Sequence, residues 1–146
     1  MSGIPTLIRL RKQAVDEARA RLAEAEGQRD ALLKRDRALV EALAAEGQAA
    51  KATLEAGRAF AGFVRRVIAE RARLAKEIAA AEAAATRAAE ELVACYRELK
   101  KFELAQASAE AARLAEEVRR ERAELDEIAA EVHRRRGENG LSLLTG

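Results

Sequence analysis

Few side chains in this sequence belong to the types that enzymes use. His133 is the single histidine and Cys95 the single cysteine, and Asp126 with Glu127 is the one carboxylate pair considered for acid–base chemistry. Adjacent residues of a helix point apart, so the two carboxylates do not form a pair around one substrate. His133 falls in a last helical turn, where the helix dipole favours a cation, and Cys95 falls on an apolar stripe. We therefore expect no enzyme, no cofactor and no metal site.

The composition is typical of a long helix or a coiled coil. Of the 146 residues, 49% are hydrophobic, 36% are charged and only 3% are aromatic, and alanine is prominent among the apolar residues. The net charge is +2, from 27 basic and 25 acidic residues that are interleaved. A nucleic-acid-binding surface needs clustered basic residues, so this pattern argues against one.

The chain contains no apolar run long enough for a membrane span, and its start lacks the pattern of a signal peptide. With one cysteine, no internal disulfide can form. We expect a cytosolic protein.

Helix signals divide the chain into two long helices. Pro5 suits the first turn of a helix, where its missing N–H costs nothing. Gly57 and Gly62 form the densest break in the middle, and "RRRGENG" reads as a helix stop with Gly137 as the C′ residue. The predicted segments are a first helix over about 5–50, a tip over 47–59, a second helix over 59–136 and a flexible tail over 137–146.

Apolar residues recur at alternating four- and three-residue steps, which is the repeat of a coiled coil. A short connection makes two such helices antiparallel neighbours. The predicted fold is all-α, a two-helix antiparallel coiled-coil hairpin. Twelve of the thirteen seam residues of the second helix are apolar, and Arg71 is the exception. The seam residues are Phe60, Val64, Val67, Arg71, Leu74, Ile78, Ala81, Ala85, Ala88, Leu92, Cys95, Leu99 and Phe102.

The second helix is expected to overhang the first at the end where the termini lie. A fold-back near residues 55–58 places residue 5 beside residues 105–111, after which the second helix continues for about 25 residues, about 40 Å. The apolar repeat changes phase at the same place. Its residues beyond Phe102 are Ala111, Leu114, Val118, Leu125, Ile128 and Val132. A stripe that changes phase where its partner ends is expected to need a different partner, or a second copy of the chain.

Three stretches resemble one known family. The start "TLIRLRKQAVDEARARLAEAE", the middle "AGRAFAGFVRRVIAERARLAKEI" and the end "YRELKKFELAQASAEAARLAEEVRRERAELDEIAAEVHRR" look like the flagellar export protein FliJ and its counterparts in virulence-type secretion. The stretch "RRERAELDEIA", Arg119–Ala129, is the most distinctive piece. The chain departs from the family in being alanine-rich over Ala79–Ala89, and "AQASAEAARLA" replaces a more heavily charged stretch.

The resemblance implies a protein similar to the central stalk of rotary ATP synthases. It would be a soluble, cytoplasmic and non-catalytic component of the type III export apparatus, associated with the inner membrane only through its partners. The implied partners are the hexameric export ATPase, whose pore the terminal end would enter, the cytoplasmic domain of the export gate, near the hairpin, and export chaperones.

Two groups of residues are the predicted partner-binding sites. In the overhang, apolar side chains would be buried and arginines would steer the helix toward acidic loops of the ATPase. This group is Leu114, Val118, Arg119, Arg120, Arg122, Leu125, Ile128 and Val132. At the tip, Phe60, Phe63 and Val67 would face the export gate, although Phe60 and Val67 also lie on the seam.

Two other functions also agree with parts of the sequence. The first is a coiled-coil scaffold or tether that self-associates through its C-terminal helix, and it stays open. The second is a nucleic-acid binder that uses Arg119, Arg120, Arg122 and Arg134–Arg136. An arginine run near a helix C-terminus is more typical of a helix end and a solvated face, so we expect no nucleic-acid partner. Co-purification with a hexameric ATPase would separate stalk from scaffold.

Overall fold

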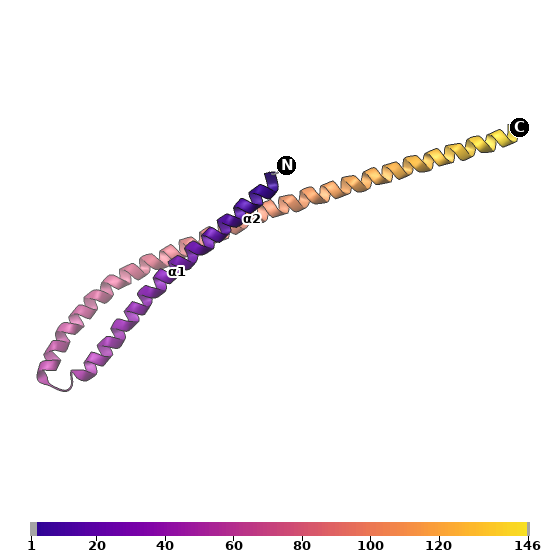
Figure 1. Ribbon diagram of the computed structural model, residues 1–146. Helices are drawn as coiled ribbons and strands as arrows, with labels where there is room; N and C mark the ends of the chain where they lie inside the picture. The colour runs from indigo at the N-terminus through magenta and orange to yellow at the C-terminus, as the bar shows by residue number, and fades with distance from the viewer. Residues whose placement is uncertain (1–2, 146) are drawn as a thin grey trace.

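The chain folds into two antiparallel helices of unequal length. The structure, a computed structural model, describes residues 3–145, with side chains placed for residues 3–140. Helix α1 spans Gly3–Ala49 and helix α2 spans Leu54–Thr145, and the described residues contain no strand. In Figure 1 the chain turns back after α1, and the N-terminus lies beside the middle of α2. The predicted all-α hairpin with a longer second helix is confirmed.

The turn lies over residues 50–53, a few residues earlier than predicted. The Thr53 hydroxyl accepts a hydrogen bond from the Ala56 N–H at 3.0 Å, which is the N-cap geometry that starts a helix. Gly57 and Gly62 therefore lie inside α2, and the prediction that the second helix begins near residue 59 is wrong. An isolated glycine costs a helix only about 1 kcal/mol against alanine. The position at which α2 starts is therefore set by the Thr53 cap and not by Gly57 and Gly62.

The C-terminal end of α2 also differs from the prediction. The helix passes through Gly137 and Gly140 and continues to Thr145, so residues 137–145 are helical rather than a flexible tail. A C′ glycine that ends a helix adopts a positive φ, and none of the glycines in the described part of the chain has one. The backbone hydrogen bonds of the helix offset the cost of both glycines. The last predicted tail residue, Gly146, lies outside the described residues.

The predicted seam is the contact between the helices. The buried side chains are Ile8, Val15 and Ala18 on α1 and Val67, Leu74, Ala85 and Ala88 on α2. The four on α2 belong to the predicted seam, and the three on α1 are spaced by seven and three residues, as the same repeat requires. Leu74 is the largest fully buried side chain, with 1% of its surface exposed. The core is therefore one row of side chains along each helix, with no room for an enclosed site.

Side-chain contacts across the seam set its register. Arg71 donates to Asp36 through Nε to Oδ1 at 2.9 Å and Nη2 to Oδ2 at 3.3 Å. Farther from the turn, the Arg11 guanidinium lies 5.5 Å from the centroid of the Phe102 ring. Residue 5 thus lies beside about residue 108, at the predicted register. Between these contacts α1 advances 25 residues and α2 advances 31, and Figure 1 shows α2 bowing outward on this longer path.

The Asp36–Arg71 pair predicts a pH dependence of stability. The hydrogen bond from Arg71, with its positive charge, holds the pKa of Asp36 below its usual value of 3.8. A carboxyl group whose pKa is lowered by folding stabilises the fold above its unfolded pKa, and that contribution is lost as the pH falls through the folded pKa. We expect Asp36→Asn to unfold at a lower temperature than wild type at neutral pH, with a difference that begins to shrink near about pH 4 and vanishes only below the lowered pKa of Asp36. Thermal unfolding followed by circular dichroism measures this. A difference that stays the same at acid pH would contradict it.

Gly27 offers a test of helix propensity without packing effects. A Cβ atom added at Gly27 would meet no atom within 4 Å, whereas one added at Gly47 would lie 3.3 Å from Cζ of Phe60. We expect Gly27→Ala to raise the free energy of unfolding by about 1 kcal/mol. Gly47→Ala, the control, should gain less because the Phe60 ring must move. Urea titration checks both, and an equal or larger gain for Gly47→Ala would count against the packing at Phe60.

Candidate partner-binding surfaces

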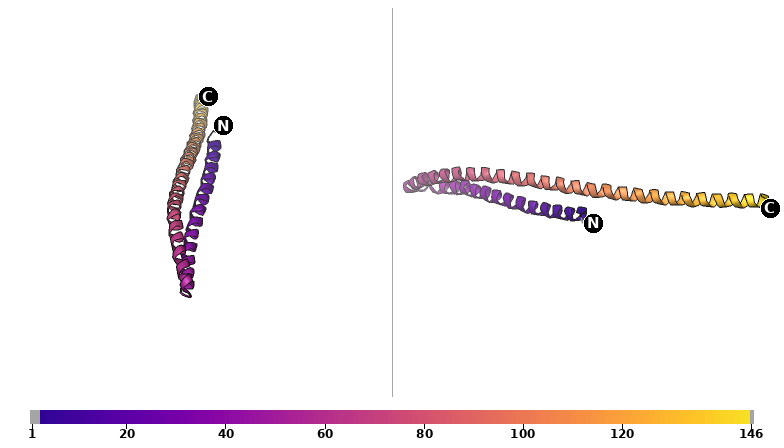
Figure 2. Two further views of the ribbon diagram at one scale, coloured as in Figure 1. Left: turned by 90° about the vertical axis from the view of Figure 1, so that its left-hand side faces the viewer. Right: turned by 90° about the horizontal axis from the view of Figure 1, so that it is seen from above.

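The side chains of α2 become exposed beyond residue 103, although the first turns of α1 still lie beside α2 up to about residue 110. Near this end of the hairpin, Arg19 donates a hydrogen bond to the Tyr96 hydroxyl, the Arg11 guanidinium lies over the Phe102 ring, and Ile8 is still buried. From residue 104 to residue 140, every side chain except Glu116 and Glu131 is exposed. Figure 2 shows α1 ending while α2 continues alone. We call residues 104–145 the overhang. It is about 60 Å long, longer than predicted because α2 does not end at residue 136.

An apolar stripe lies open along the overhang. Its exposed fractions range from 43% at Val132 to 65% at Leu125. The predicted members Leu114, Val118, Leu125, Ile128 and Val132 are all exposed. The stripe also includes Leu104, which the sequence reasoning missed. Leu104 lies seven residues before Ala111, so extending the four/three repeat toward the N-terminus predicts it.

The stripe does not continue the seam. Phe102 faces α1, under the guanidinium of Arg11. Leu104 lies two residues farther, about 200° around the helix at about 100° per residue. The apolar side chains of the overhang therefore begin on the side of α2 that faces away from α1. No lengthening of α1 along its present path would cover them.

Two of the three predicted steering arginines are already paired. Arg119 and Arg120 both contact Glu116, the first by a hydrogen bond and the second with Nε 3.9 Å from Oε1. Arg122 makes no ion pair within the part of the chain that the structure describes. Exposed pairs of this kind contribute roughly 0–1 kcal/mol. They can be exchanged for partner contacts at little cost.

The three residues of the predicted tip patch do not form one surface. Val67 is 3% exposed and lies in the seam, so it is a core residue rather than a free contact. Phe60 is half-buried, with its ring against Gly47. Phe63 is half-buried and lies beside the seam rather than on it. Of the three, only Phe63 keeps both an off-seam position and part of its surface free.

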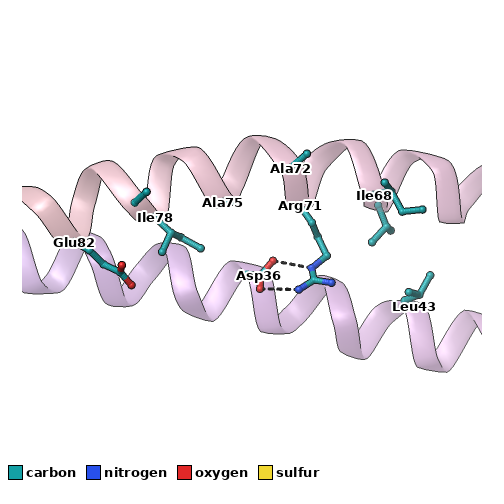
Figure 3. Close-up of a pocket in the computed structure, with 10 residues that line it drawn as sticks. Asp36, Leu43, Ile68, Arg71, Ala72, Ala75, Ile78 and Glu82 are labelled. Atoms are coloured by element: carbon teal, nitrogen blue, oxygen red, sulfur yellow. Dashed lines mark hydrogen bonds and ion pairs between the residues drawn. The ribbon is translucent and has the colours of Figure 1, made fainter.

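Two exposed apolar residues in the first part of α2 were not among the predicted contacts. Leu54 and Ile68 are exposed, and fourteen residues of separation place them on nearly the same face of α2. Ile68 also lines a shallow groove of about 520 Å³, together with Ala72 and Ala75. Figure 3 shows this groove, with Arg71 reaching across to Asp36. Asp36 and Arg71 neutralise each other, and Glu82 lines the far end of the groove without an ion pair among the described residues.

The residues considered for chemistry are dispersed. Cys95 is half-buried on the seam, while His133, Asp126 and Glu127 are exposed on the overhang. Within residues 3–140, no three His, Cys, Asp or Glu side chains gather closely enough to hold a metal ion. As for membranes, neither helix has an apolar stretch that could cross one between residues 3 and 145.

A comparison with protein families finds a match over most of the chain. A family model described as "Flagellar FliJ protein" matches residues 2–138, which include almost all of α1 and α2 up to the predicted helix stop. No curated protein and no solved structure matches the chain. The matched residues contain the seam, the turn and the whole overhang stripe.

Proposed function

Because the chain belongs to the flagellar FliJ family, whose members are non-catalytic components of the flagellar export apparatus, we propose that it is the central stalk of the hexameric export ATPase. The overhang enters the pore of the ATPase ring, and the hairpin extends away from it toward the cytoplasmic domain of the export gate. The observation that carries this proposal is the overhang, which extends about 50 Å beyond the start of α1 as a single helix with an uncovered apolar stripe.

The dimensions of the overhang suit an axial position. A single α-helix with its side chains is about 10–12 Å across, which is the thinnest rigid element that a protein can insert between surrounding subunits. The stripe runs along its length and would give several subunits apolar contacts at different heights. The hairpin is twice as thick and would stay outside.

On this proposal the chain performs no catalytic step itself. It acts through contacts that favour one conformation of the ATPase over another, which is how a binding partner can change a rate. It works in the cytoplasm and reaches the inner membrane only through the export apparatus. Export chaperones are further proposed partners, and the hairpin surface left free by the ATPase and the gate is the place for them.

The experiment that tests the stalk is binding of the full chain to the cognate export ATPase. The chain and the ATPase should co-elute in size-exclusion chromatography in the presence of nucleotide, and the chain should increase the rate of ATP hydrolysis. A chain that neither co-elutes with the hexamer nor changes its rate is not its stalk. A self-associated chain under the same conditions would favour the scaffold function.

Phe63 tests the gate-facing tip. We expect Phe63→Ala to weaken binding to the cytoplasmic domain of the export gate more than it lowers the melting temperature. Phe60→Ala is the matched control, and it should do the reverse because its ring packs against Gly47. Surface plasmon resonance measures the affinity of each variant for the gate domain, and thermal unfolding measures its melting temperature. If Phe63→Ala mainly lowers the melting temperature, Phe63 belongs to the core.

A further inference from the structure

A row of glutamates follows the overhang stripe at seven-residue spacing. Its members are Glu103, Glu110, Glu117, Glu124 and Glu131. Each comes directly before a residue of the stripe, at positions 104, 111, 118, 125 and 132, so all five lie along the same edge of it. We call this row the acidic edge.

The opposite edge of the stripe carries no acid. The residues four positions after those same stripe residues are Ser108, Ala115, Arg122, Ala129 and Arg136. The stripe itself is interrupted by Glu121 and Arg135, which occupy the three-residue steps after Val118 and Val132. The overhang is thus an apolar surface with one acidic edge, one neutral-to-basic edge and two charged interruptions.

The acidic edge is available to a partner. Arg113 donates to Glu117 at 2.6 Å and also to Glu110, while Arg134 donates to Glu131 at 2.6 Å. All of these ion pairs lie on the exposed surface of a single helix, where such pairs are weak. Glutamates of this kind can change from an arginine of their own helix to a cation of a partner.

Pairing with a second copy in antiparallel orientation brings the acidic edges together. In an antiparallel coiled coil, equivalent edges face each other, so the glutamate row of one copy lies against the glutamate row of the other. Like charges that face across a helix interface are destabilising. The opposite edges would bring Arg122 and Arg136 toward one another in the same way.

Parallel pairing avoids that repulsion but creates another. Glu117 would meet Arg122 of the other copy, and Glu131 would meet Arg136, which is favourable at an exposed edge. However, each residue of the stripe then packs against itself, so Glu121 meets Glu121 and Arg135 meets Arg135 in the buried layer. Burying two like charges costs more than exposed edge pairs contribute.

We propose that these charges reserve the overhang for a different protein, one whose contact surface sets lysines or arginines beside apolar side chains. The acidic edge attracts that partner, and the interruptions at Glu121 and Arg135 prevent the stripe from pairing with its own copy. The identity of the partner as the export ATPase rests on the proposed function. The exclusion of self-pairing does not.

Analytical ultracentrifugation of the full chain tests the exclusion of self-pairing. Wild type should sediment as a monomer up to submillimolar concentration. Glu121→Leu with Arg135→Leu should dimerise at least about a hundredfold more tightly, because two buried leucine layers replace two like-charge layers. The control, Glu127→Leu with Arg134→Leu, places the same two leucines off the stripe and should stay monomeric. A wild-type dimer, or no dimer of the stripe variant, overturns the proposal.

Binding to the cognate ATPase tests the acidic edge. Glu117→Gln, Glu124→Gln and Glu131→Gln together should weaken binding by about tenfold at low salt. The control, Glu116→Gln, Asp126→Asn and Glu127→Gln together, removes the same charge from other faces and should weaken it less than about twofold. Equal effects of the two sets overturn the proposal while the stalk stands. A wild-type chain that binds no ATPase removes the stalk, and sedimentation then decides the exclusion of self-pairing alone.

Discussion

Replacing Leu125 and Ile128 with alanine is expected to weaken binding to the hexameric export ATPase by at least about tenfold. Both side chains are more than half exposed in the free chain, so a partner that covers them removes most of their apolar surface from water. Burial of one such side chain contributes roughly 1.5–3 kcal/mol. Stimulation of ATP hydrolysis should fall with the affinity, and a titration of the chain into the ATPase measures both.

The fold of the free double variant should be unchanged. Alanine is the best helix former, and α1 does not reach these residues, so helical content and melting temperature should match wild type. Asp126→Ala with Glu127→Ala is the control on other faces of the same turn, and it should keep most of the affinity. If the Leu125/Ile128 variant instead melts earlier or dissociates an oligomer, with ATPase stimulation intact, the stripe serves self-association.

Leu74→Ala is expected to be the most damaging single truncation in the hairpin. Leu74 is the largest fully buried side chain in the described residues, and truncation of a buried leucine typically costs 2–5 kcal/mol, through lost transfer free energy and the cavity left behind. A seam only one row deep has few neighbours that could fill the space. Urea unfolding followed by circular dichroism should show the loss in the free energy of unfolding of the hairpin.

Ile68→Ala is the matched control for Leu74→Ala. Ile68 lies six residues earlier on the same helix and is 62% exposed. Its truncation should change the free energy of unfolding by less than about 0.5 kcal/mol. Similar losses for the two variants would mean that the helices do not pack along the seam described here.

The fold class and the seam were predictable because both depend on local properties of the chain. Alanine, leucine, arginine and glutamate favour the helix at every position they occupy. A four/three repeat then specifies which face of each helix must be covered. The buried residues Ile8, Val15 and Leu74 lie on that repeat. The overhang stripe was predictable for the same reason, since a repeat out of phase with the seam cannot face α1.

The ends of the helices were not predictable from glycines. Gly57 and Gly137 carry strong local signals, yet both lie within α2. A helix ends where a capping group forms hydrogen bonds with the terminal backbone N–H or C=O groups more favourably than a further helical turn would. At the turn, the hydroxyl of Thr53 does so for the Ala56 N–H. Gly137 has no positive φ, and the helix continues past it to Thr145.

Which predicted contact residues are free was decided only by tertiary structure. Phe60 and Val67 both lie on the predicted seam and were both expected to face a partner, but α1 buries Val67 whereas Phe60 stays half-buried. The sequence by itself determined two helices, their seam and the phase of the overhang stripe. Periodicity states which side chains share a face, whereas the length and path of the neighbouring helix decide whether that face meets protein or water. The overhang stripe is open because it begins on the side of α2 that faces away from α1.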